Sequence, residues 1–230
     1  MAYTLHFAPD NASLVIRLAL EHRRLPYACT LVDRRVNAQS APDYLALNPN
    51  GQIPVLETPD GAIFETGAIL LWLADTHGQL GPAPQDGTRG DFLKWLFFAA
   101  NTLHPSLRMM FYPEKYILAD QTETLRAGLA KHLHVNLTTL DQIAAERPTW
   151  FGAPSPTVLD FYTVAMLRWS ALYPRGKTEW FDLDRYPALR RICASVEALP
   201  CTLALQKAEG LGITPFTAPS PVSPPIGSAT

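Results

Sequence analysis

The stretch that decides the fold is residues 44–75, which read YLALNPNGQIPVLETPDGAIFETGAILLWLAD. Two short apolar runs, Ile53–Leu56 and Ala62–Phe64, flank the turn signal Pro59-Asp60-Gly61. That arrangement predicts a β-hairpin. The apolar run that follows, from about Thr66 to Asp75, has the length and composition of a helix. A hairpin followed at once by a helix therefore ends the first part of the chain.

The residues before this stretch predict a βαβ unit. Residues 3–7 alternate in the manner of a strand, and Ser13 is placed to N-cap a helix with apolar residues at helical spacing. A second strand is expected over Tyr27–Val32 and a short helix over Pro42–Leu47. A strand, a helix and a strand within some thirty residues imply a parallel pair. The first 77 residues are thus predicted to run βαβαββα.

After this segment the character of the chain changes. Residues 78–90 are rich in Gly, Pro and polar residues and read as a linker. No strand is expected beyond it, and apolar residues recur at helical spacing through residue 212. The expected helices are Asp91–Met110, Thr122–Ala145, Thr157–Tyr173, Pro187–Leu199 and Thr202–Glu209. We therefore predict an α/β domain over 1–77, a linker over 78–90, an all-helical domain over 91–212 and a tail over 213–230.

Proline marks the tail. Of 21 prolines, five fall in the last sixteen residues, which excludes a helix there. An extended, partly ordered terminus is the expected reading, and docking through Ile213 and Phe216 is the alternative.

Composition limits the function classes. Nineteen Lys and Arg against 21 Asp and Glu give a net charge of −2, without a basic run for nucleic acid or anionic lipid. The three cysteines (Cys29, Cys193 and Cys201) form no disulfide framework or zinc pattern, which suits a reducing cytosol. The N-terminus lacks the features of a signal peptide, and no apolar run is long enough to span a membrane. A cytoplasmic protein is expected.

Several strings in both halves resemble the cytosolic glutathione transferases. Residues 44–75 are similar to the family's glutathione-binding core, and Pro156–Phe161 resembles its N-capping box and hydrophobic staple, with Asp160 as a folding element. MLRWSALYP (166–174) and residues 186–210 look most like the bacterial beta class and its neighbours. The resemblance covers nearly all of residues 1–212 and implies a thioredoxin-like α/β N-terminal domain with an all-α C-terminal domain.

The resemblance implies how glutathione would be bound. Thr66 and the backbone N–H groups beside it would hold the γ-glutamyl carboxylate, although Thr66 could also simply cap its helix. Glu65 would pair with the ammonium group. Ile53-Pro54 resembles the family's cis-proline position, where the Ile53 backbone pairs with the cysteinyl unit. Gln52 would contact the peptide or its glycine carboxylate. His104 would contact the glycine carboxylate or the second substrate, while His104 as a packing residue is equally open.

The residue that activates the thiol is less determined. Beta-class enzymes have a cysteine where helix alignment places Ala12, which has no hydrogen-bond donor. Ser13 is the first candidate to stabilise the thiolate and Asn11 the second, with the backbone N–H groups and helix dipole as a third possibility. Ser13 as an N-cap alone is equally open.

A pocket for the second substrate is expected between the domains. Aromatic and Met side chains there would form an adaptable apolar site for an electrophile. The residues expected to line it are Arg108, Met109, Phe111 and Tyr112, whereas Met110 and Phe98 are as well explained as interdomain core.

Three functions fit this sequence. The first is a detoxifying glutathione transferase that joins glutathione thiolate to small hydrophobic electrophiles, without a metal and as a homodimer. The second is a glutathione-dependent disulfide reductase or peroxidase. The third is a non-catalytic glutathione-binding or assembly module. No nucleic acid or membrane partner is expected.

Overall fold

The computed structural model describes residues 3–229 and contains a four-stranded mixed sheet in the order β2-β1-β3-β4. β1 pairs in parallel with β2, whereas β3 runs antiparallel to both β1 and β4. The strands are β1 Tyr3–Phe7, β2 Tyr27–Leu31, β3 Val55–Thr58 and β4 Gly61–Phe64. The parallel pair and the hairpin are therefore confirmed, and β3 begins just after Pro54 instead of at Ile53.

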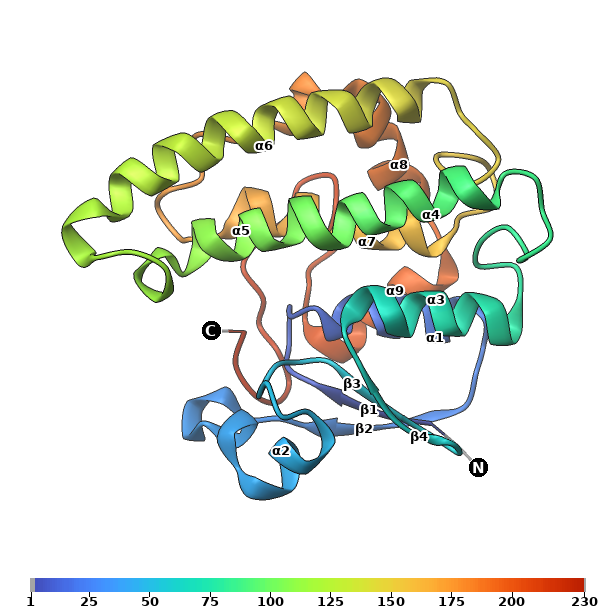
Figure 1. The fold of residues 1–230 in the computed structure, drawn as a ribbon, viewed down its shortest axis with the longest axis horizontal. Helices are drawn as coiled ribbons and strands as arrows, with labels where there is room; N and C mark the ends of the chain where they lie inside the picture. The colour runs from blue at the N-terminus through green and yellow to red at the C-terminus, as the bar shows by residue number, and fades with distance from the viewer. Residues whose placement is uncertain (1–2, 230) are drawn as a thin grey trace.

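Helices cover both faces of the sheet. α1 (Ser13–His22) and α3 (Thr66–His77) lie on one face, and the short α2 (Pro42–Leu47) lies on the other (Figure 1). This confirms a thioredoxin-like α/β arrangement.

The second part of the chain is helical. α4 and α5 form one continuous rod, as predicted for residues 91–110, but a π-helical turn at Ala99–Leu103 joins them. Such turns often occur at functional sites. No helix within residues 3–229 has the length and apolar character needed to cross a membrane. The helices are α4 Arg89–Phe98, α5 His104–Phe111, α6 Thr122–Ala145, α7 Val158–Leu172, α8 Pro187–Glu197 and α9 Pro200–Glu209.

α1 and α7 form the centre of the molecule. α1 is buried from Ser13 to Leu20 because it packs against the sheet and α3 on one side and against α7 and α9 on the other. All residues of α7 but one are buried. Complete burial of one Val, Leu, Ile, Phe or Met side chain stabilises the folded state by about 1.5–3 kcal/mol. The two central helices therefore hold the halves of the chain together.

The predicted capping box at the start of α7 is confirmed. The Leu159 N–H donates to Thr157 Oγ1 at 3.2 Å, and the Thr157 N–H donates to Asp160 Oδ2 at 2.7 Å. The Gly152 N–H donates to the other Asp160 oxygen at 2.8 Å. Asp160 is thus a buried folding element that fixes where α7 begins.

The predicted N-cap of α1 is wrong. α1 begins at Ser13 itself, and Ala12 occupies the cap position without a side-chain hydrogen bond. The chain turns at Asp10 with a left-handed φ of 51°, which places the Ala8 carbonyl near Ser13. The Ser13 hydroxyl donates to that carbonyl at 3.0 Å. Ser13 therefore ties the helix back to the preceding loop.

The C-terminal segment packs on the body, so the expectation of a partly ordered terminus is wrong. Phe216 is 1% exposed, and the backbone N–H groups of Phe216 and Thr217 donate to Glu197 Oε2 at 2.9 and 3.0 Å. Ile213, the other proposed anchor, is 90% exposed. The segment docks through Phe216 because the Glu197 carboxylate on α8 accepts the backbone donors on either side of the buried ring.

Candidate functional site

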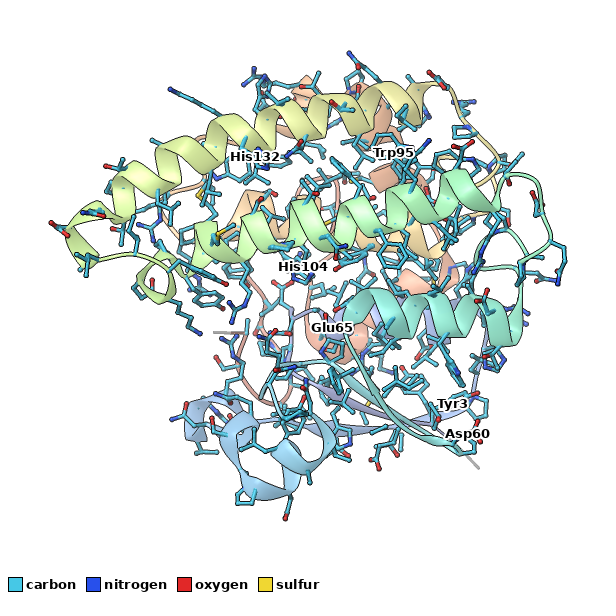
Figure 2. The ribbon with its side chains drawn as sticks, in the orientation of Figure 1. Tyr3, Asp60, Glu65, Trp95, His104 and His132 are labelled. Carbon is cyan, nitrogen blue, oxygen red and sulfur yellow. The ribbon has the colours of Figure 1, made fainter. Side chains whose placement is uncertain are left out.

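A cavity of about 1040 Å³ lies between the sheet part and the helical part of the molecule. Figure 2 shows His104 on α5 and Glu65 at the start of α3 on either side of this region. The volume is at the upper end for small-molecule sites. Of the residues predicted for the site, those at the cavity are Asn11, Gln52, Ile53, Pro54, Glu65, Thr66, His104, Arg108, Phe111 and Tyr112.

The loop before β3 forms one wall. The Ile53–Pro54 peptide bond is cis, as the resemblance implies. The Tyr44 hydroxyl and the Asn48 side-chain amide each donate to the Gln52 carbonyl at 2.8 Å, so two side chains fix the loop from below. The Gln52 side chain is exposed. The loop therefore presents a side-chain amide and an extended backbone segment to the cavity.

The start of α3 forms the neighbouring wall. Glu65 has a positive φ of 71°, which is unusual for a residue other than glycine; such strained positions cluster at functional sites. Glu65 is exposed, and Thr66 is buried as the first residue of α3. The unpaired N–H groups and positive dipole of a helix N-terminus favour a carboxylate. The segment thus combines an anion site with an acidic side chain beside it.

At the start of α1, the structure reverses the order of the two thiol-activating candidates. Asn11 lines the cavity with Asp10 and Ala12, whereas Ser13 is fully buried outside it and its hydroxyl is engaged by Ala8. The Asn11 Oδ1 atom accepts the Ala12 N–H at 2.8 Å. Its Nδ2 group is left as a donor at the N-terminus of a helix. The expectation that the Ser13 hydroxyl activates a thiol is therefore wrong for this geometry.

Asp10 is a site residue that sequence reasoning missed. Its carboxylate is buried and accepts Arg168 Nε at 2.8 Å, Arg168 Nη2 at 3.0 Å and the Tyr173 hydroxyl at 2.7 Å. The Asp10 N–H donates to the buried Glu209 carboxylate at 2.9 Å. Bidentate pairing with arginine gives strong geometric restraint. This network fixes the loop that carries Asn11 against α7 and α9.

His104 faces the cavity as a neutral group. Its Nδ1 atom is 2.6 Å from the Tyr162 hydroxyl, and its ring lies 5.4 Å from the Trp169 ring, centroid to centroid. Burial, with a smaller contribution from Arg108, lowers the pKa of His104 to about 4. At neutral pH His104 therefore acts as a hydrogen-bonding group and not as a cation.

The predicted second-substrate wall is partly corrected. Arg108, Phe111 and Tyr112 line the cavity, but Met109 does not: it packs against the hydrophobic core. Successive side chains on a helix diverge by about 100°, which turns Met109 away from the face of α5 that Arg108 and Phe111 share. Aromatic residues contribute to this wall, but so do charged residues that the apolar expectation missed. Further cavity residues are Arg34, Lys115, Trp169, Tyr173, Arg175 and Ala229.

The cysteine thiols lie outside the cavity lining. Burial raises the pKa of all three, that of Cys201 to about 11, so they are protonated at neutral pH. Within residues 3–229, no group of three or more His, Cys, Asp or Glu side chains is placed to hold a metal ion.

Family models match two segments of the chain. The model described as "Glutathione S-transferase, N-terminal domain" matches residues 12–76, which hold the start of α1, the cis-proline loop and Glu65-Thr66. The model described as "Glutathione S-transferase, C-terminal domain" matches residues 121–195, which include α7.

Individual proteins are similar over most of the chain. Glutathione S-transferase GST-4.5 of Xanthomonas campestris is 30% identical over 170 residues, 72% of this chain and 81% of the relative. The disulfide-bond oxidoreductase YfcG of Escherichia coli is 30% identical over 218 residues, which are 89% of this chain and 95% of the relative. A Burkholderia graminis glutathione transferase with two glutathione molecules bound per subunit is 26% identical. The two structures superpose with a TM-score of 0.76 over 92% of this chain and 90% of the Burkholderia chain.

Proposed function

This chain belongs to the glutathione S-transferase family, and from that membership we propose that it joins the sulfur of glutathione to an electrophilic carbon of a small second substrate. The observation that carries the proposal is the convergence of three segments on one cavity: the α1 N-terminus, the cis-proline loop and Glu65-Thr66. Each matches a different part of glutathione.

We assign the glutathione contacts as follows. The α3 N-terminus with Thr66 holds the γ-glutamyl carboxylate, and Glu65 pairs with the ammonium group. The Ile53 backbone pairs with the cysteinyl unit in the manner of an added strand. Gln52 and the neutral His104 donate hydrogen bonds to the glycine end or to the second substrate.

Asn11 is the proposed thiolate-stabilising residue. Its side-chain amide and the first N–H groups of α1 place donors and a helix dipole at one end of the cavity, and both favour an anionic sulfur. The thiol proton leaves to solvent. The thiolate electron pair forms the new C–S bond, and the leaving group departs with the electrons of the broken bond. Proximity and charge stabilisation supply the acceleration.

A glutathione-dependent disulfide reductase is the second candidate. It is favoured by similarity to the Escherichia coli relative, which is named a disulfide-bond oxidoreductase and is matched over 95% of its length. Because the chain's own thiols lie outside the cavity, the attacking thiolate would be that of glutathione, which would displace one sulfur of the substrate disulfide. We also propose, on family membership, a cytoplasmic homodimer with a role in detoxification.

The test compares Asn11→Ala with Ser13→Ala. We expect wild-type protein to conjugate glutathione to 1-chloro-2,4-dinitrobenzene. Asn11→Ala should raise the pKa of the thiol of bound glutathione and lower kcat/KM by about a hundredfold. The pKa is measured from thiolate absorbance against pH. Ser13→Ala should leave this pKa unchanged, because its hydroxyl is bonded to Ala8. Absence of turnover with this substrate, together with rapid reduction of hydroxyethyl disulfide, would favour the reductase.

A further inference from the structure

Four cationic side chains line the cavity. Arg108 on α5, Lys115 in the turn after it and Arg175 after α7 all line the cavity from the helical part. Arg34, just after β2, adds a fourth cation from the sheet part. An apolar co-substrate site has no need of four such groups around one cavity.

The contacts of these cations are to neutral groups. Arg108 donates to the Tyr116 hydroxyl, and the Lys115 ammonium lies 4.7 Å from the centroid of the Tyr112 ring. Arg34 donates to the Ala229 carbonyl at 2.7 Å and to the Tyr112 hydroxyl at 3.1 Å. Across the described part of the chain, residues 3–229, none of the four forms an ion pair with a carboxylate.

The acids of the cavity do not offset this charge. Asp10 is fully engaged by the buried Arg168 and by Tyr173. Glu65 stands at the start of α3, where the proposed function gives it the ammonium group of glutathione. Like charges that line one concave surface raise the local potential, and low-dielectric walls concentrate it. The cavity therefore attracts an anion.

We propose that the second substrate is an electrophile with an apolar body and an anionic group, such as a carboxylate. This inference rests on the proposed function. The body packs against Phe111 and Trp169, and the carboxylate lies among Arg108, Lys115 and Arg175. The reaction is unchanged: the glutathione sulfur forms a bond to the electrophilic carbon and the leaving group departs. The cations contribute by binding and orientation.

The experiment uses two matched probes, 4-chloro-3,5-dinitrobenzoate and the corresponding benzamide. In both, thiolate displaces chloride from the same ring carbon, and each rate is divided by its uncatalysed rate with free glutathione. We expect kcat/KM to favour the benzoate by about tenfold at low ionic strength, with the preference shrinking in about 0.5 M salt because exposed charges are screened. A cation that binds the glycine carboxylate of glutathione would affect both probes equally.

Lys115→Gln/Arg175→Gln removes two exposed cations from the cavity, and Lys131→Gln/Lys207→Gln removes two exposed cations elsewhere. The first pair should reduce the preference for the benzoate from about tenfold to about twofold or less, because each cation contributes about two- to fivefold. The second pair, with the same change in net charge, should leave the preference at its wild-type value. Equal use of both probes by wild-type protein, or an equal loss in both double variants, would overturn the inference.

Binding separates this inference from the proposed function. Calorimetry with the two glutathione conjugates needs no turnover. Tighter binding of the carboxylate conjugate, lost in Lys115→Gln/Arg175→Gln, supports the inference. Equal affinity for both conjugates overturns it and leaves the glutathione site intact. Failure of both conjugates and of glutathione itself to bind overturns the proposed function, and the inference with it.

Discussion

At the scale of single residues, His104 shows how burial sets chemistry. The imidazole has a hydrogen-bond partner in Tyr162 and an aromatic neighbour in Trp169, with the Arg108 guanidinium nearby. Partial desolvation and a neighbouring cation both disfavour the protonated ring, which is why its pKa falls to about 4. A histidine expected from the sequence to bind a carboxylate is thereby limited to hydrogen bonding.

This depressed pKa makes a stability prediction. The unfolded chain takes up a proton on His104 near its ordinary pKa of 6.5, whereas the folded chain does so only near 4. The contribution to stability is therefore fully present above pH 6.5 and is lost as the pH falls toward 4. Between about pH 7 and about pH 5 the loss from this group is about 2 kcal/mol. His104→Gln should remove that part of the pH dependence in urea unfolding, whereas His132→Gln, an exposed residue of α6, should not. An identical pH dependence in wild type and His104→Gln would contradict the assignment.

At the scale of elements, α7 organises the helical side of the site. It carries Tyr162 and Trp169, which are seven residues apart and therefore lie on the same side of the helix, and Arg168, which lies about 100° around the helix from Trp169. Through them it reaches His104 and Asp10. Because this helix is buried along almost its whole length, any shift in where it starts would move all three contacts. The capping box at Thr157 and Asp160 is therefore part of what positions the cavity.

Thr157→Ala should lower the free energy of unfolding by about 1–2 kcal/mol, because it removes the hydroxyl that accepts the Leu159 N–H and donates to the Trp150 carbonyl. Thr138→Ala is the matched control, since its exposed hydroxyl bonds only to the His134 carbonyl within α6. We expect the control to change stability by less than about 0.5 kcal/mol. Equal losses in the two variants, measured by urea unfolding, would show that the cap does not fix α7.

At the scale of the whole molecule, the C-terminal segment joins parts that are distant in sequence. Arg168 donates to the carbonyls of Pro215 and Ser220 at 3.0 and 3.1 Å as well as to Asp10. Farther on, Ala229 reaches the cavity and accepts from Arg34. One buried arginine therefore ties the α1 loop, α7 and the tail together, and the tail contributes to the cavity wall.

Phe216→Ala should destabilise the protein by about 3–5 kcal/mol, because it removes a ring that is 1% exposed and leaves a cavity. Ile213→Ala, three residues earlier and 90% exposed, should cost less than about 0.5 kcal/mol. Thermal and urea unfolding of the two variants measure the difference. Similar stabilities would mean that the tail adds little to the fold.

The sequence by itself determined the elements. Local signals were sufficient where a short stretch of sequence specifies the element without help from the rest of the chain. Examples are the hairpin around Pro59-Asp60-Gly61, the α7 capping box and the helix Thr122–Ala145, whose bounds the structure reproduces. Strings in both halves also identified the family, and ten of the twelve site residues predicted from the sequence line the cavity. Boundaries shifted by one or two residues where tertiary packing extends or shortens an end, as at β3 and α3.

Only the tertiary structure decided which side chains face the cavity and what charge they carry. Ser13 and Asn11 are two positions apart, yet the left-handed turn at Asp10 buries the first and presents the second. Met109 and Arg108 differ in the same way around α5. The cationic wall depends on Arg34, Arg108, Lys115 and Arg175, which no local pattern groups together. Their convergence, like the docking of Phe216, arises from contacts between segments far apart in the chain, because burial and electrostatic fields depend on distance in space and not along the sequence.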